Sequence, residues 1–283
     1  MKIAVVGLGL IGGSLCKTIK RYTSHLCLGY DLDKNTVRQA LEAGAIDEAI
    51  RPENLSQADF TIVSLHPAQT ITFLREHAQD FRKGSIVIDT CGVKESIIDG
   101  IGDSLERKNV AFVGCHPMAG REFSGFAYSL GNLFDHASFI ITPVESTSKQ
   151  AVEAVRQFAT ELHFPNIVIA TPAEHDRVIA FTSQLAHIVS NAYVKSPVLG
   201  YQSGFSAGSF LDLTRVAKLN ESMWTDLFLM NQPSLLVELD NIILHLQEYR
   251  AAIAENDGDR LKTLLRDGRI LKEESLKKNN EPC

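Results

Sequence analysis

Three glycines near the N-terminus have the spacing of a dinucleotide-binding loop. Gly7, Gly9 and Gly12 form a G-x-G-x-x-G run after a short apolar segment. The first glycine of such a run allows a tight turn, the second lets the backbone approach a pyrophosphate, and the third lets a helix pack closely on a strand. The spacing predicts a cofactor-binding loop made of Gly7, Leu8, Gly9, Leu10, Ile11 and Gly12.

An acidic residue follows this loop where a ribose-binding carboxylate is expected. Asp31 comes 19 positions after Gly12, at the end of a second apolar run. A carboxylate there accepts hydrogen bonds from the adenosine ribose, and its charge repels a 2'-phosphate. We therefore expect NAD rather than NADP as the cofactor. Lys34 and Arg38 lie nearby in the sequence and could soften that preference.

A histidine follows another apolar run, at the point where a strand is expected to end. His116 lies in the block GCHPMAGRE, which closes on Glu122. Open parallel sheets bind ligands at the carboxyl ends of their strands. Removing a hydride from a carbon that bears a hydroxyl also requires a group that takes the hydroxyl proton, and neutral imidazole suits that role. We predict that His116 is catalytic and that Glu122 tunes or gates it; a structural histidine and a solvated carboxylate are the alternatives.

The block Asp89–Lys94 closes one more predicted strand and opens a helix at the same edge. Its small residues would let nicotinamide and substrate approach the backbone. We therefore assign Thr90 and Gly92 to the substrate site. Cys91 is interpreted as a small packing residue, since nothing else in the sequence indicates acyl or thioester chemistry. Lys94 either pairs with a carboxylate or lies on the helix surface.

A polar stripe is predicted on a helix in the second half of the chain. Ser183, His187 and Asn191 recur at four-residue spacing, and the positions between them are mostly apolar. The apolar surroundings favour a cleft over open solvent. Arg215 follows in the block DLTR, and its planar guanidinium suits bidentate binding of a carboxylate. We expect His187 and Arg215 on the substrate side, although Asp212 offers Arg215 a local ion-pair partner.

Alternating strands and helices are predicted to position these residues in the first half of the chain. The expected strands are Lys2–Val6, Leu26–Tyr30, Phe60–Leu65, Ser85–Ile88, Val110–Val113 and Ser138–Thr142. The helices between them include Ile11–Arg21, Lys34–Glu42 and Ser148–Leu162. Strands separated by helices indicate a parallel sheet covered on both faces. Leu65 and His66, at the end of the third strand, are assigned to the cofactor site.

After Thr171 the pattern becomes helical. The expected helices are Ala173–Val194, Ser222–Met230, Pro233–Ile253 and Arg260–Leu276. We predict an α/β fold of two domains: a Rossmann-type parallel-sheet domain over residues 1–171, then an all-helical substrate and dimerisation domain over residues 172–283. The third of these helices is apolar along one face, which needs a partner in this chain or in a second copy.

Composition argues against several other classes of protein. A net charge of −6 and the absence of a basic run argue against nucleic-acid binding. The five cysteines are scattered and contain no C-x-x-C pair, which argues against a disulfide framework and a metal site. Glycines interrupt the apolar N-terminus, and no run reaches the length of a membrane span. We expect a soluble cytoplasmic protein with a small-molecule substrate and no metal.

Together these blocks resemble those of the prephenate and arogenate dehydrogenases of tyrosine biosynthesis. The resembling segments are GLGLIGGS at 7–14, DTCGVK at 89–94, GCHPMAGREFSG at 114–125, HDRVIAFTSQLAH at 175–187 and FLDLTRVAKLNESMWTDLFLMN at 210–231. The resemblance implies a Rossmann domain followed by a helical domain through which two subunits interlock as a homodimer. It also implies NAD-dependent oxidative decarboxylation of prephenate to 4-hydroxyphenylpyruvate, or of arogenate to tyrosine.

Roles of individual residues follow from the same resemblance. The family histidine that hydrogen-bonds the ring hydroxyl during hydride transfer corresponds to His116, and the glutamate of the same block to Glu122. The residues on the side that holds substrate carboxylates correspond to His187 and Arg215. The family often has serine at the position of Gly92, so here the role of that hydroxyl is missing or passes to Thr90.

Two other functions are compatible with a glycine loop on this plan. One is a related hydroxyacid dehydrogenase or imine reductase, because the same two-domain arrangement serves several substrates. The HPMAG and D-x-T-R blocks together argue against it. The other is a non-catalytic NAD-sensing regulator, and the joint presence of His116, His187 and Arg215 argues against that. The choice between prephenate and arogenate, and any inhibition by tyrosine, stay open at the level of sequence.

Overall fold

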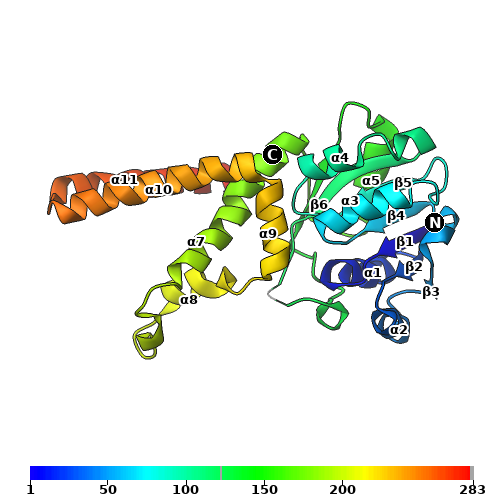
Figure 1. Cartoon of the computed structure of the whole chain (residues 1–283), viewed down its shortest axis with the longest axis horizontal. Helices are drawn as coiled ribbons and strands as arrows, with labels where there is room; N and C mark the ends of the chain where they lie inside the picture. Colours follow the sequence, from blue (N-terminus) through cyan, green and yellow to red (C-terminus); the bar gives the residue numbers. More distant parts are fainter. Residues whose placement is uncertain (122, 281–283) are drawn as a thin grey trace. The chain divides into compact units, whose positions relative to one another are not determined.

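The computed structural model describes residues 1–121 and 123–280, with the side chains of residues 278–280 left undescribed. The chain divides into two compact units, Met1–Gln232 and Pro233–Cys283. The predicted division into a Rossmann domain over residues 1–171 and a helical domain over residues 172–283 stays a prediction. In the described part, an α/β region is followed by helices, as the sequence predicts (Figure 1).

The first unit is built on an eight-stranded sheet with the order β3-β2-β1-β4-β5-β6-β7-β8. Its strands are β1 (Lys2–Val6), β2 (Leu26–Tyr30), β3 (Glu48–Ala49), β4 (Phe60–Val63), β5 (Ile86–Asp89), β6 (Ala111–Pro117), β7 (Ser138–Thr142) and β8 (Asn166–Ile169). Two of them, β3 and β8, are absent from the sequence prediction. Both lie at the outer edges of the sheet, where a strand needs less apolar sequence.

All neighbouring strands are parallel except β6 and β7, which pair antiparallel. The predicted parallel sheet is therefore confirmed except at this one pair. Parallel neighbours require a crossover connection, usually a helix. In its described part, the connection from β6 to β7 contains only the 3₁₀ turn Phe126–Tyr128, so the chain returns in the opposite direction. The helix α5 (Lys149–Glu161) connects β7 to β8, and that pair is parallel again.

Helices cover both faces of the sheet, and the side chains of β1 show why. Ile3 and Val5 point into one buried apolar cluster, and Ala4 and Val6 point into another. Alternation along a strand sends successive side chains to opposite faces, so a strand that is apolar throughout is buried on both. The covering helices are α1 (Leu10–Tyr22), α2 (Lys34–Glu42), α3 (Pro67–Glu76), α4 (Glu95–Ile101) and α5.

The helix predicted over Ala173–Val194 is present but not uniform. It consists of α6 (Pro172–Ile179), the π-helical segment Ala180–Leu185 and α7 (Ala186–Tyr193). Thr171 and Glu174 form a capping box at its start. Such π-helical turns are rare in proteins, and those that do occur are often found at functional sites.

The helix α9 (Glu221–Met230) packs against the connection between β5 and α4. Leu227 contributes to a buried cluster with Val93 and Ile97, and Trp224 packs against that cluster. The preceding α8 (Gly208–Thr214) is short and was not predicted. The helix α9 therefore brings the helical part of the first unit to the carboxyl edge of the sheet.

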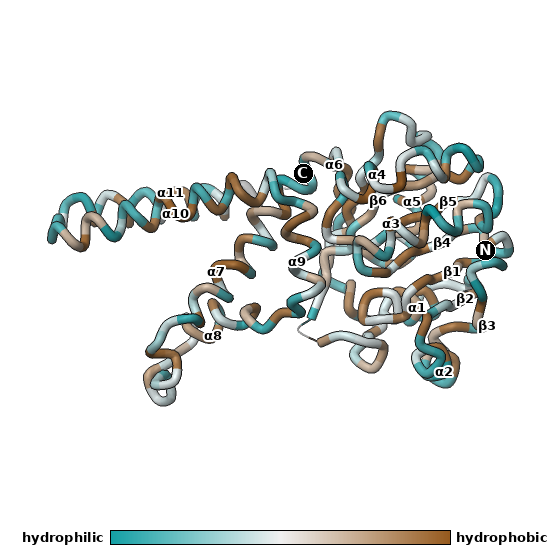
Figure 2. The backbone as a smooth tube through the Cα atoms, viewed as in Figure 1, coloured by the Kyte–Doolittle hydropathy of each residue, from teal (hydrophilic) through white to brown (hydrophobic). Residues whose placement is uncertain are grey.

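The second unit contains most of α10 (Gln232–Ala254) and all of α11 (Gly258–Asn280). Tyr249 Oη donates a hydrogen bond to the Leu264 carbonyl, 3.2 Å away, and ties the two helices together. Hydrophobic side chains remain exposed on both, including Ile253 at 65% and Leu271 at 67%. Figure 2 shows hydrophobic and hydrophilic residues interspersed along both helices. Among the described helices, none combines the length and hydropathy that a membrane span requires.

Candidate active site

The glycine loop joins β1 to α1, and two of its glycines are required by the fold itself. Gly7 has φ +87°, and a Cβ there would lie 2.5 Å from the Ser64 carbonyl oxygen. A Cβ on Gly12 would lie 1.9 Å from the Gly7 carbonyl oxygen. No other residue type fits either position without moving backbone, so these two glycines are explained by packing alone.

Gly9 differs from its neighbours because it faces open space. A Cβ there would meet nothing within 4 Å, and Gly9 is the N-cap residue of the 13-residue α1, with no side-chain cap. The N–H groups at a helix N-terminus lack partners within the helix and attract phosphate. Leu8 is fully buried, whereas Leu10 and Ile11 are half-buried. The loop therefore has the shape and the donors that a pyrophosphate needs.

Asp31 lies directly after β2 and fastens the loop in place. Its carboxylate accepts hydrogen bonds from Leu8 N, 2.8 Å away, and from Asp33 N, 2.9 Å away. An ionised carboxylate has about four acceptor positions, so two remain for ribose hydroxyls. Leu65 is half-buried beyond the end of β4, and His66 is exposed as the N-cap of α3. Asp31, Leu65 and His66 thus follow the ends of β2 and β4, the two parallel strands that flank β1.

A fully buried ion pair joins the ends of β5 and β6. Lys94 Nζ donates to the Asp89 carboxylate and to the Cys115 carbonyl, the latter at 2.7 Å. The same carboxylate accepts from Cys91 N at 2.9 Å and from Cys115 N at 3.0 Å. Of the two alternatives for Lys94, pairing with a carboxylate is correct.

The small residues between Asp89 and Lys94 divide into packed and open positions. Thr90 Oγ1 donates to Ser64 Oγ at 3.2 Å. Burial raises the pKa of the Cys91 thiol to about 12, so this thiol stays protonated at neutral pH, as a packing residue would. A Cβ on Gly92 would lie 3.4 Å from Leu227 Cδ2 and 3.9 Å from His116 Nε2. Gly92 therefore leaves bare backbone beside the imidazole.

His116, at the end of β6, is the first member of a chain of hydrogen bonds. Its Nδ1 lies 2.9 Å from Nε2 of His175, and Nδ1 of His175 lies 2.7 Å from Oδ1 of Asp176. The Asp176 carboxylate also accepts from Lys94 N at 2.8 Å and from Glu95 N at 2.9 Å. We refer to His116, His175 and Asp176 as the histidine chain.

Both imidazoles of the histidine chain are neutral at neutral pH. Burial lowers the pKa of His116 well below its ordinary value, and the neighbouring His175 and Lys94 lower it further. Burial also lowers the pKa of His175, against the opposing effect of the Asp176 carboxylate. Sequence reasoning included His175 and Asp176 in a resembling block but gave them no role. Their signal was a histidine and an aspartate adjacent at the start of a helix.

The predicted polar stripe runs from the π-helical segment into α7, and it makes its hydrogen bonds inside the protein. His187 Nδ1 lies 2.9 Å from the Ser183 carbonyl, and Asn191 Nδ2 donates to the Ala217 carbonyl at 3.2 Å. The His187 ring lies over Trp224, with ring centroids 3.9 Å apart. Burial lowers the pKa of His187, and the nearby Arg215 guanidinium lowers it further.

The helix α9 connects these residues to His116. Trp224 and Leu227 are three positions apart on α9, so they share one face of it. Trp224 contacts His187, and Leu227 lies beside Gly92. The predicted residue Glu122 lies outside the described residues.

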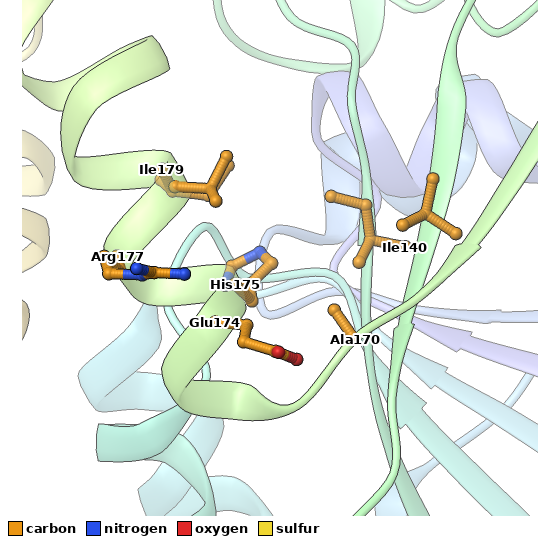
Figure 3. A pocket seen from close by; sticks show the side chains of 8 residues that line it. Ile140, Ala170, Glu174, His175, Arg177 and Ile179 are labelled. Carbon is orange, nitrogen blue, oxygen red and sulfur yellow. The ribbon is translucent and has the colours of Figure 1, made fainter.

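A pocket of about 280 Å³ lies on the outer side of His175, between α6 and the edge of the sheet. Figure 3 shows Glu174, His175 and Ile179 of α6 opposite Ile140 and Ala170. Both ring nitrogens of His175 are already bonded to His116 and Asp176, and the His175 side chain is fully buried. The pocket thus offers no free polar atom of the histidine chain to a ligand.

The fold and this site define a Rossmann-type protein with a dinucleotide loop and a neutral histidine at the carboxyl edge of its sheet. Residues 15–168 match the family model described as the nucleotide-binding domain of prephenate dehydrogenase. Residues 171–267 match the model described as the dimerization domain of prephenate dehydrogenase. The chain belongs to the prephenate dehydrogenase family.

Individual relatives agree with this assignment. A prephenate dehydrogenase of Bacillus subtilis is 32% identical over 270 residues, which cover 92% of this chain and 72% of the relative. The crystal structure of an arogenate dehydrogenase from Synechocystis has 28% identity and a TM-score of 0.80, with 97% of this chain and all of that one covered. A prephenate dehydrogenase from A. aeolicus, in complex with hydroxyphenyl propionate and NAD+, has 27% identity and a TM-score of 0.83, with 97% and 98% covered.

Proposed function

We propose that this chain is an NAD-dependent dehydrogenase of tyrosine biosynthesis that oxidatively decarboxylates prephenate or arogenate. Prephenate gives 4-hydroxyphenylpyruvate and carbon dioxide, and arogenate gives tyrosine. Membership of the family supports the reaction, and the NAD+ complex of the A. aeolicus relative supports the cofactor. The single observation that carries the proposal is the half-buried neutral His116, next to the bare backbone of Gly92 and at the same edge of the sheet as the glycine loop.

The cofactor site consists of the glycine loop and the strand ends beside it. The open face of Gly9 and the N-terminus of α1 receive the pyrophosphate, and Asp31 binds the ribose. Leu65 and His66 line the site beyond β4. NAD, when bound, accepts the hydride from the substrate ring. The free acceptor positions of Asp31 and its negative charge favour NAD over NADP.

The protein residues position the substrate and manage one proton. His116 accepts the proton of the ring hydroxyl through Nε2 as the hydroxyl carbon loses its hydride. Loss of carbon dioxide then makes the ring aromatic, which drives the reaction forward. His187 and Arg215 hold substrate carboxylates, Thr90 and Gly92 line the reacting ring, and Glu122 tunes or gates His116. Orientation of the two reactants is the main contribution of the protein.

The helical region contributes the assembly. We infer that residues 1–171 bind the cofactor, whereas residues 172–283 complete the substrate site and form a homodimer. The dimerization-domain match and the exposed hydrophobic side chains of α10 and α11 support this inference. A reducing compartment such as the cytoplasm fits the described cysteines, which are buried free thiols.

NADH formation tests the proposal directly. The enzyme is assayed with prephenate and with arogenate, each with NAD and with NADP, for the wild type and His116→Asn. We expect NAD-dependent turnover that falls by about 10²–10⁴-fold in the variant while NAD affinity persists, because only the proton acceptor is lost. His77→Asn, a histidine that pairs with Asp80 at the end of α3, is the matched control and should keep wild-type turnover.

Each negative result has a distinct meaning. Unchanged turnover in His116→Asn would refute the role given to this histidine. NAD binding by the wild type without NADH formation from either substrate would refute the reaction and favour a regulator.

A further inference from the structure

Behind His116 lies a second histidine that is buried and fully hydrogen-bonded. His175 is 2% exposed, and it joins His116 on β6 to Asp176 on α6. The histidine chain thus connects an element of the sheet to the helix that opens the helical region. The reaction as proposed above uses only Nε2 of His116, the ring nitrogen that is not bonded to His175.

The donor and the acceptor of each hydrogen bond in the histidine chain can be assigned in turn, starting from Asp176. Asp176 accepts from the backbone N–H groups of Lys94 and Glu95, so its carboxylate acts as an acceptor. His175 must then donate from Nδ1–H to Asp176, which leaves His175 Nε2 as a lone pair. That lone pair accepts from Nδ1–H of His116. Neutral His116 consequently carries its hydrogen on Nδ1, and its Nε2 is free to accept.

We propose that His175 and Asp176 are positioning residues that hold His116 with its Nε2 free and share the positive charge once it takes a proton. The inference rests on the proposed function. When the proton of the ring hydroxyl binds Nε2 of His116, the Nδ1 proton of His116 can move to Nε2 of His175. His175 becomes the imidazolium, and its Nδ1–H stays on the Asp176 carboxylate. The number of protons is unchanged, and no redox partner is involved in this step.

The surrounding charges favour this transfer. The charged groups that face the two histidines are Lys94, Asp89 and Asp176. Lys94 and Asp89 form their own buried ion pair, so their charges largely offset each other. The Asp176 carboxylate is bound by neutral N–H groups and by His175. In a medium of low dielectric constant a buried carboxylate stabilises a cation on the group it contacts.

A purely structural role is the competing explanation, because Asp176 also anchors the start of α4 and Asn231. Asn231 Nδ2 donates to the Asp176 carbonyl at 2.8 Å. A structural role predicts a loss of stability with an unchanged pH profile. The proposal instead predicts that kcat and the acid limb of the pH profile change, while the KM values for substrate and NAD hold.

The experiment compares four variants of the full-length chain. Asp176→Asn removes the charge and can present an amide N–H to His175, which favours the wrong tautomer. His175→Gln keeps an oxygen that can accept from His116 but cannot carry a proton, and His175→Ala removes both functions. Glu174→Gln is the control, since Glu174 lies next to His175, is exposed, and serves the capping box. Melting temperature and NAD affinity are measured for each.

We expect Asp176→Asn to lower kcat by at least about tenfold with KM values within about threefold. Its acid limb should move to lower pH, because the protonated histidine pair loses its counter-charge. His175→Gln should retain more activity than His175→Ala, and Glu174→Gln should change only the melting temperature. If Asp176→Asn does not fold, the comparison of His175→Gln with His175→Ala tests the proposal instead.

The opposite pattern would overturn the inference. Wild-type kcat and pH profile in His175→Ala would do so, as would equal losses in the Asp176 variant and the Glu174 control. Equal activity of His175→Gln and His175→Ala would refute the tautomer role. If the wild type forms no NADH from either substrate, the proposed function has failed instead, and the two failures are distinguishable.

Discussion

The glycine loop and the histidine chain lie at the same edge of one sheet, but they are held in different ways. In the loop, two glycines are fixed by backbone contacts within the β1–α1 connection and with Ser64. In the histidine chain, the first two members are 59 positions apart and meet through one hydrogen bond. The loop therefore depends on backbone shape, whereas the histidine chain depends on protonation.

This difference teaches where each half of the site is sensitive. A methyl group at Gly7 or Gly12 is enough to disrupt the loop, because the close-packed backbone there has nowhere to move. The histidine chain tolerates changes of shape better than changes of charge, since its function is to choose which nitrogen carries a hydrogen. We therefore expect glycine substitutions to affect mainly the glycine loop, and changes of pH to affect mainly the histidine chain.

The largest effect is expected at Gly12. Gly12→Ala places a Cβ within 1.9 Å of the Gly7 carbonyl oxygen, so the loop and α1 must separate. We expect the free energy of unfolding to fall by about 3 kcal/mol and NAD binding to be lost. Thermal melting and NAD titration measure both. Gly9→Ala is the matched control, because its Cβ meets nothing within 4 Å.

Gly9→Ala should melt like the wild type but bind NAD about tenfold more weakly, since the methyl group occupies space needed by the pyrophosphate. If both variants melt normally and differ only in NAD affinity, the loop is not held by its backbone as described. If Gly9→Ala binds NAD with wild-type affinity, the pyrophosphate lies elsewhere.

The second effect is a pH dependence that originates in the histidine chain alone. His116 must be neutral to accept a proton, and burial, His175 and Lys94 hold its pKa well below its ordinary value of 6.5. Activity is therefore complete above pH 6.5 and is lost as pH falls through the lowered pKa. Below that pKa, kcat/KM should fall about tenfold per pH unit, while NAD affinity changes little. An acid limb centred above pH 6.5 would contradict this environment for His116.

The sequence predicted the fold well where apolar runs are continuous and buried. The strands at Lys2–Val6, Leu26–Tyr30 and Ser138–Thr142 occur at the predicted residues. The edge strand Asn166–Ile169 was missed because it is mostly exposed and carries a weak apolar pattern. The antiparallel direction of β7 was also missed, because strand direction depends on the connection and not on the strand's own residues.

The residues of the candidate site likewise fall into those whose contacts the sequence could predict and those whose contacts it could not. The position of Asp31 beside the glycine loop could be predicted, because its spacing from Gly12 is set by one helix and one strand; its role in binding ribose stays a prediction. The Asp31 bond to Leu8 N supports that reasoning in three dimensions. His175 could not be paired with His116 from the sequence, because their contact depends on how α6 packs against β6. Spacing predicts contacts inside one supersecondary unit, and tertiary packing decides the rest.

The smallest effect is expected at Gly92, beside the first member of the histidine chain. A Cβ there would lie at an ordinary contact distance of 3.4 Å from Leu227 Cδ2, so Gly92→Ser should fold and melt like the wild type. The added hydroxyl can reach His116 Nε2 and donate to it, which stabilises the neutral imidazole. The acid limb of kcat/KM should then move to lower pH, with kcat at pH 8 within about threefold of the wild type. Gly92→Ala, which adds the Cβ without the hydroxyl, should leave the acid limb in place. A similar shift in both variants would show that the Cβ, rather than a hydrogen bond to His116, causes it.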